Sequence, residues 1–175
     1  MTEEIWKPVQ RFGKIIPGYY VSNLGRIMGR RGKIYIGRQS KKLARKNDKT
    51  ARLTFDFRVP HGFYPNYVYR NPVGEKNVVI TVAVHRLVMD AFKPLDEYPP
   101  IPKEDWGKTP ESAKNFIRDT VVIDHINDDP FDNRVENLRW VSSLQNSNYR
   151  KKYETINFEK HKINSEKTLL ERFLV

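Results

Sequence analysis

The first half of the chain alternates short hydrophobic segments with turns, which is typical of an antiparallel sheet. Residues 18–27 predict a strand, a turn at Ser22–Gly25 and a returning strand, because Asn and Gly tolerate the positive φ that such turns need. Residues 33–36 and 51–59 predict further strands between basic loops. Residues 60–77 mix Pro and Gly with aromatic side chains, which predicts a turn-rich hairpin or loop whose aromatics pack rather than stack on bases.

The second half changes to a mixture of strands and helices. Residues 78–84 have the pattern of a strand, and residues 85–92 repeat apolar side chains at helical spacing. Lys93 and Pro94 end that helix.

The segment from 93 to 120 is rich in proline, which predicts an extended connector. Towards its end, Thr109-Pro110-Glu111 predicts the start of a short helix, with Thr109 as N-cap and Ile117 near the C-terminus.

Residues 121–150 predict a strand, a polar loop, a second strand and a helix. The first strand leads into Asp124 and His125, and the helix begins with the capping box Ser142-Ser143-Leu144-Gln145. The unit is too small to bury much of itself, but it places Asp124 and His125 opposite the first turns of the helix. Beyond it, residues 165–175 predict an amphipathic helix that docks on the body or on a partner chain.

Composition indicates a globular chain. The 175 residues suffice for one domain or one core with appendages, and 38% are hydrophobic. We expect no membrane span and no signal peptide, because the apolar runs are short. The chain has no cysteine, which excludes disulfides and thiolate zinc sites and fits a reducing cytoplasm.

The net charge of +11 favours a polyanionic partner, since Lys and Arg displace counterions from phosphates. The charge is uneven: residues 1–60 hold 15 Lys and Arg against 4 Asp and Glu, and residues 121–150 hold 3 against 5. A solvated basic surface is the alternative explanation.

Residues 124–146, DHINDDPFDNRVENLRWVSSLQN, resemble the HNH nuclease motif in the form found in phage and intron-encoded homing endonucleases. That form has Asp-His, a polar loop, Asn-Leu-Arg-Trp and an Asn on the closing helix. Upstream, Trp6 and the run GYYVSNLGRI at 18–27 resemble the small nuclease-associated modular domain that often precedes HNH motifs in phage proteins. Residues 84–92 also resemble the segment before the Asp-His of this class.

The resemblance implies roles for four residues. Asp124 and Asn146 would bind a divalent metal, Mg²⁺ or Mn²⁺, for which hard oxygen ligands are suited. His125 would be the general base, because a neutral imidazole accepts a proton near pH 7. Asn137 would hold the loop and orient His125. Many HNH proteins have His where this chain has Asn146, and Asn148 would face the other side of the helix.

Other residues near the motif keep two interpretations. His85 could approach the scissile phosphate as support for the active site, or tie its helix to the motif as a buried histidine. Arg139 could clamp a phosphate of DNA or pair with a loop carboxylate. The carboxylates in question, which we expect to cap and shape the loop rather than to bind metal, are Asp128, Asp129 and Asp132.

The basic N-terminal segment is the expected DNA-binding region, because antiparallel ribbons rich in Arg and Lys can enter a DNA groove. The candidate contacts there are Arg26, Arg30, Arg31, Lys33, Arg38, Lys41, Lys42, Arg45 and Lys46.

The expected fold is α+β: a small N-terminal antiparallel β module, a ββα-metal nuclease motif and a C-terminal helix. The expected domains are a basic β-rich module at 1–77, an HNH nuclease domain at 78–152 with an inserted connector at 93–120, and a tail at 153–175. The implied protein is a phage-encoded homing endonuclease that nicks double-stranded DNA in the bacterial cytoplasm, as a monomer or homodimer. The alternatives are a non-catalytic DNA-binding or regulatory protein on the same scaffold, and a structure- or RNA-directed nuclease.

Overall fold

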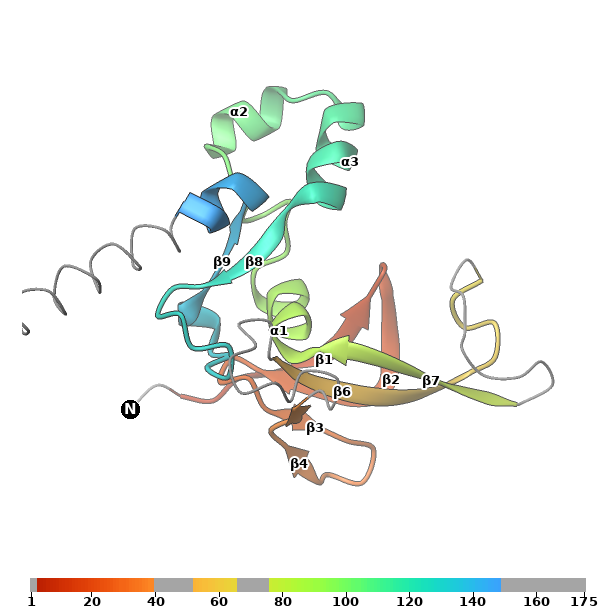
Figure 1. Cartoon of the computed structure of the whole chain (residues 1–175). Coiled ribbons are helices and arrows are strands. Elements are labelled where there is room, and N and C mark those ends of the chain that lie inside the picture. Colours follow the sequence, from red (N-terminus) through yellow and green to blue (C-terminus); the bar gives the residue numbers. More distant parts are fainter. Residues whose placement is uncertain (1–2, 40–51, 66–75, 149–175) are drawn as a thin grey trace, which may run out of the picture.

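The computed structural model describes residues 3–39, 52–65 and 76–148. Two antiparallel sheets come first, and helices and a short β-hairpin follow, so the α+β prediction is confirmed (Figure 1). The predicted C-terminal helix and the boundary at 152–153 lie outside the described residues.

The first sheet has four antiparallel strands in chain order: β1 (Trp6–Arg11), β2 (Lys14–Ser22), β3 (Ile27–Met28) and β4 (Ile34–Tyr35). The turn predicted at Ser22–Gly25 is present, with the Gly25 N–H donating to the Ser22 carbonyl at 3.0 Å. The sequence pattern did not predict β1, because Pro8 interrupts it and Val9 is its only fully buried side chain.

The second sheet consists of β5 (Arg38–Gln39), β6 (Leu53–Pro60) and β7 (Asn77–Ala83), all antiparallel. Phe57 of β6 pairs with Ile80 of β7, and both are buried. Helix α1 (Val84–Phe92) follows β7 without a loop, so β7 determines where α1 begins.

Helix α1 lies between the sheets and the β-hairpin (Figure 1). Val84, Leu87, Val88 and Met89 are completely buried in one hydrophobic cluster that includes residues of both sheets and of the hairpin. Burying each such side chain contributes about 1.5–3 kcal/mol.

Hydrogen bonds fix both sides of the C-terminal end of α1. On the sheet side, Lys7 Nζ donates to the Ala91 carbonyl at 3.1 Å, and Gln10 Nε2 donates to the Asp90 carbonyl at 2.7 Å. On the hairpin side, Trp140 Nε1 donates to the Lys93 carbonyl at 2.8 Å. The helix therefore holds the hairpin in a fixed place relative to the N-terminal sheet.

The inserted segment differs from the prediction in two respects. It contains helix α2 (Lys103–Lys108) where we expected an extended connector, because Trp106 is buried and holds this turn of chain against its neighbours. The next helix, α3 (Glu111–Thr120), has Pro110 as N-cap, so the assignment to Thr109 is wrong. The Thr109 hydroxyl instead donates to the Asp105 carbonyl in α2.

The C-terminal unit is close to the prediction. Strands β8 (Val122–His125) and β9 (Leu138–Val141) form an antiparallel hairpin, and the 3₁₀ helix η2 (Val135–Asn137) precedes β9. The predicted capping box is confirmed: the Gln145 N–H donates to Ser142 Oγ at 3.1 Å, and the Ser142 N–H donates to Gln145 Oε1 at 2.9 Å. It starts the helix whose described part is residues 143–148.

The Ser22–Gly25 turn packs directly on the loop between β8 and β9. The Val135 N–H donates to the Asn23 carbonyl at 2.8 Å. Gly25 has φ +78°, and a Cβ at this position would lie 2.8 Å from the Asn133 carbonyl oxygen. Glycine is therefore required here both for its conformation and for the space that it leaves.

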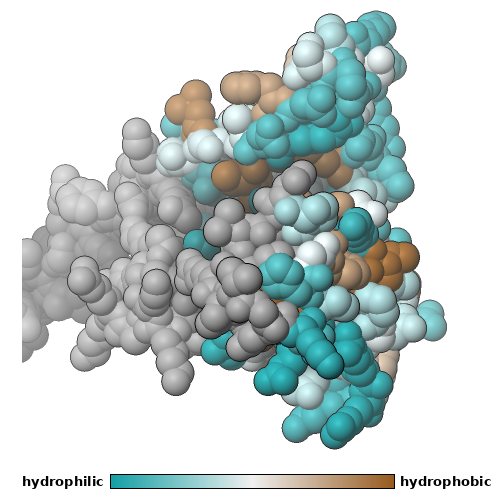
Figure 2. All heavy atoms as spheres, turned by 90° about the vertical axis from the view of Figure 1, so that its right-hand side faces the viewer, coloured by the Kyte–Doolittle hydropathy of each residue, from teal (hydrophilic) through white to brown (hydrophobic). Residues whose placement is uncertain are grey.

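The surface in Figure 2 is mostly hydrophilic, with hydrophobic side chains in separate patches. Exposed apolar residues occur on several elements, including Phe12 in the β1–β2 turn and Phe116 on α3. In the described part of the chain, every helix is too short or too polar to cross a membrane.

We expect Gly25→Ala to lower the free energy of unfolding more than Gly32→Ala. Gly32 has φ +73°, and a methyl group added there would meet no atom within 4 Å, so alanine costs about 1–2 kcal/mol of backbone strain alone. At Gly25 the same strain adds to displacement of the Asn133 backbone. Urea denaturation of both variants measures the difference, and equal losses would contradict the close contact.

Candidate active site

Asp124 and Arg139 face each other across the β8–β9 hairpin. The antiparallel register pairs the two residues, and Arg139 Nε lies 2.8 Å and its terminal nitrogen 2.7 Å from Asp124 Oδ2. The carboxylate is 7% exposed. Arg139 thus pairs with Asp124 rather than with a loop carboxylate, and both contacts use one oxygen of Asp124.

His125 contacts Asn133, a residue that the sequence analysis did not single out. His125 Nε2 lies 3.2 Å from Asn133 Oδ1. The Asn133 amide nitrogen donates to the Phe131 carbonyl at 3.2 Å, which turns Oδ1 towards the histidine. An amide oxygen only accepts, so Nε2 carries the proton and Nδ1 of the neutral ring keeps its lone pair.

Asn137 holds the loop between β8 and β9, as we expected. Its amide group accepts from the Asn127 N–H at 3.0 Å and donates to Asn127 Oδ1 at 2.9 Å and to the Asp132 carbonyl at 2.8 Å. The side chain that directly contacts His125 is Asn133, so an orienting effect of Asn137 would act through this loop.

The loop carboxylates make the local contacts that we expected of them. Asp129 Oδ1 accepts from the Phe131 N–H, and Asp132 pairs with Arg134 at 2.8 Å. Asp128 has φ 60°, a conformation that Asp tolerates better than most residues.

Asn146 lies on the closing helix, directly after the capping box. Its Oδ1 is buried and has no hydrogen-bond partner among the described residues. A buried acceptor without a donor is costly, and a bound cation is one way to satisfy it. Asp124 and Asn146 both offer hard oxygen ligands, which suit Mg²⁺ or Mn²⁺. Within residues 3–39, 52–65 and 76–148, no cluster of three or more His, Asp or Glu could hold a metal.

His85, in the first turn of α1, packs edge-to-face against His125 with 5.3 Å between the ring centres. Its Nδ1 is buried and has no hydrogen-bond partner in the described structure. Burial lowers the pKa of His85 to about 3, with smaller contributions from Arg52, Arg86 and the repulsion that a protonated His125 would add. His85 is therefore neutral at physiological pH, and it ties α1 to the hairpin.

Residues 82–148 match the family model of the HNH endonuclease. This segment is therefore similar to the HNH endonuclease domain. A solved structure described as DNA binding and cleavage by the HNH homing endonuclease I-HmuI is similar, with 20% identity and a TM-score of 0.49. The alignment covers 90% of this chain, and this chain spans 64% of that one. Comparison with curated proteins gives no match.

The cationic residues expected to bind DNA lie before the HNH domain, and several already have protein partners. Arg26 pairs with Glu4 and Arg38 pairs with Asp56, whereas Arg30 packs over the Tyr19 ring at 5.3 Å. Arg31 and Lys33 are exposed. The other predicted contacts, Lys41, Lys42, Arg45 and Lys46, lie outside the described residues.

The sequence analysis missed three residues around the HNH domain: Asn133, Arg52 and Arg86. Asn133 follows a loop of polar residues in which any side chain could have faced His125. Arg52 and Arg86 are far apart in the sequence, and only the pairing of β6 with β7 brings them to one place. Their spacing in the sequence therefore gave no sign that they lie close together.

We expect the stability of the protein to fall as the pH is lowered from about 6.5. His85 binds a proton readily in the unfolded chain, whereas the folded protein holds its pKa at about 3. Between these values, protonation favours unfolding by up to about 1.4 kcal/mol per pH unit. Urea denaturation at several pH values from 7 to 5 measures the slope. His85→Gln should flatten it, and an unchanged slope would contradict a neutral buried His85.

Proposed function

We propose that the protein is a metal-dependent HNH endonuclease of the homing type, which hydrolyses a phosphodiester bond in double-stranded DNA. The observation that carries the proposal is the geometry at His125. Asn133 fixes the ring so that Nδ1 keeps its lone pair, and the adjacent Asp124 offers a buried carboxylate. The homing class rests on the Asp-His-Asn-Asn form of the motif in the sequence.

His125 acts as the general base in this proposal. Its Nδ1 takes a proton from a water molecule, the water oxygen attacks phosphorus, and the 3′ oxygen departs with the electron pair of the broken bond. Asn133 keeps the imidazole in the required tautomer and orientation, as in other enzymes where a second residue orients the base. Asn137 keeps the supporting loop in place.

Asp124 and Asn146 would hold the divalent cation, Mg²⁺ or Mn²⁺. When bound, the cation neutralises charge on the phosphate and on the departing oxygen. Arg139, which now pairs with Asp124, would keep the carboxylate oriented and remain close to the phosphate.

The N-terminal module at residues 1–77 would bind the duplex through the cationic side chains of its sheet and loops.

One HNH domain contains one His125, so a monomer would cut one strand and act as a nickase. Cutting of both strands would require a homodimer or two successive events. A phage origin and action in the bacterial cytoplasm are the setting that the motif implies.

One observation favours a second candidate, a DNA-binding protein without catalytic activity. Arg139 already neutralises Asp124 through two contacts, so the carboxylate could serve the fold alone. The buried and unpartnered Asn146 Oδ1 favours the enzyme, because an amide that served only the fold would be expected to have a donor.

We expect the protein to convert supercoiled plasmid carrying its natural target region to open circles when Mg²⁺ or Mn²⁺ is present. His125→Ala should lower the rate by about 10²–10⁴-fold, because it removes the base. Asn146→Ala should raise the metal concentration that is needed for half-maximal cleavage.

The matched control is His61→Ala, which removes an exposed histidine in the turn after β6. Its cleavage rate should equal that of the unmodified protein. Tight DNA binding without cleavage in either metal would refute the endonuclease and favour the non-catalytic candidate, and linear product would indicate paired active sites.

We expect Asn133→Ala to lower kcat about 10-fold or more while KM for DNA changes little, because the variant loses the contact that orients the base. Asn133→Asp restores an acceptor and adds a negative charge, which favours the protonated imidazole. The acidic limb of its pH–rate profile should therefore shift to higher pH. Equal profiles for Asn133→Asp and the unmodified protein would show that this side chain does not act on His125.

A further inference from the structure

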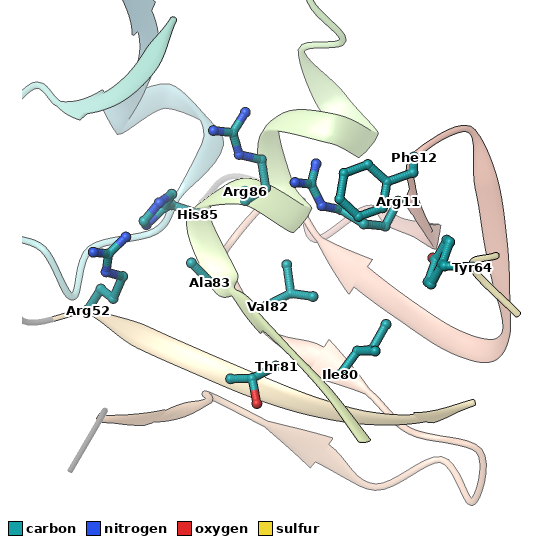
Figure 3. Close-up of a pocket in the computed structure, with 10 residues that line it drawn as sticks. All are labelled: Arg11, Phe12, Arg52, Tyr64, Ile80, Thr81, Val82, Ala83, His85 and Arg86. Carbon is teal, nitrogen blue, oxygen red and sulfur yellow. The ribbon is translucent and has the colours of Figure 1, made fainter. Parts of the chain in front are cut away.

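A pocket of about 240 Å³ lies beside the HNH motif, between the β1–β2 turn, β7 and the start of α1 (Figure 3). Three arginines line it from three separate elements: Arg11 at the end of β1, Arg52 before β6, and Arg86 in α1. His85 and Ala83 form the wall at the start of α1, and Phe12 and Tyr64 form the opposite end.

The charges around the pocket are not balanced by the protein. Arg11 pairs with Asp90 at 3.0 Å, and the same carboxylate also attracts Arg86. Arg86 packs over the Trp140 ring at 5.0 Å, and burial lowers its pKa, with a further contribution from Arg11. Arg52 has no ion pair among the described residues. Asp90 therefore interacts with two of the three guanidinium groups, Arg11 and Arg86. Placing like charges together costs free energy unless an anion joins them.

The start of α1 adds donors to the same pocket. The first turn of α1 has no acidic residue, and the N-cap Ala83 has no side chain that could satisfy the free N–H groups. His85 Nδ1 is buried there without a partner in the described structure, and a neutral ring can present an N–H at this atom. Arginine forks together with a helix N-terminus favour an oxyanion.

The pocket is next to the catalytic histidine, because His85 lines it and packs on His125 at 5.3 Å between ring centres. Successive phosphates of one DNA strand advance by about 3.4 Å along the helix axis, so a strand cut at His125 places its next phosphates within reach. We propose that this pocket binds a backbone phosphate of the cleaved strand, one or two nucleotides from the bond that is cut. This inference rests on the proposed function for the identity of its ligand.

The first test measures binding of a mixed-sequence DNA duplex in EDTA, so that cleavage plays no part. Arg52→Gln removes an exposed cation of the pocket, and Lys108→Gln removes an exposed cation of the distant α2 as the matched control. The slope of log K against log salt should become less negative by about 0.9 for Arg52→Gln, the value for one lost phosphate contact. The slope for Lys108→Gln should equal that of the unmodified protein.

The second test separates binding from folding. Ala83→Asp introduces a good N-cap residue, which should raise the melting temperature, while its carboxylate competes with an anion in the pocket. DNA affinity should nevertheless fall. In parallel, sodium sulfate should raise the melting temperature of the unmodified protein over sodium chloride at equal ionic strength, and Arg52→Gln should lose part of that rise.

The results distinguish the pocket from the proposed function. Equal salt slopes for Arg52→Gln and Lys108→Gln, or unchanged DNA affinity in Ala83→Asp, would overturn the phosphate pocket even if the protein cuts DNA. The expected differences in a protein that does not cut DNA would support the pocket as a phosphate site and refute the endonuclease. A protein that binds neither DNA nor sulfate would overturn the pocket as well.

Discussion

The close packing of the Ser22–Gly25 turn against residues 133–135 is the contact on which the geometry around His125 depends. Gly25 lets the turn approach the Asn133 backbone, and the Asn23 carbonyl accepts from the Val135 N–H at 2.8 Å. Asn133 in turn contacts His125. The turn between β2 and β3 is therefore connected to His125, the proposed general base, through Asn133. The ββα unit is too small to bury much of its own loop, and the packed turn helps to hold that loop in place.

Local sequence patterns were sufficient to predict those elements whose structure depends on residues close together in the chain. The capping box at Ser142, the turn at Ser22–Gly25 and the strand before α1 all depend on residues a few positions apart, and all are present. Tertiary contacts decided the rest. The segment around Trp106 is helical although it is rich in proline, because the Trp106 side chain is buried. Strand β1 forms because it pairs with β2. For the same reason, candidate site residues could be proposed from their order in the motif, but the contact of Asn133 with His125 required the folded loop.

Asp124 has two potential partners, and their competition determines what the site can do. Two nitrogens of Arg139 lie 2.7 and 2.8 Å from Oδ2 of Asp124, so Oδ1 can still face a cation. A cation at this carboxylate would be repelled by the guanidinium unless phosphate groups also approach. In the proposed endonuclease, DNA would supply those phosphates, so metal and DNA would favour each other's binding. The coupling is reciprocal: whatever DNA adds to metal affinity, the metal adds to DNA affinity.

The neutral state of His85 follows from the same concentration of positive charge. Burial and the charges of His125, Arg52 and Arg86 all oppose its protonation, which lowers its pKa to about 3. A neutral ring next to His125 adds no positive charge, so the proposed proton uptake by His125 would meet less repulsion than a second imidazolium would cause. A phosphate among the arginines would reduce that repulsion further, because its negative charge lies next to the ring on which His125 packs. The arginine pocket and the proposed general base are thus linked through His85, and DNA bound at both places would assist the proposed proton transfer.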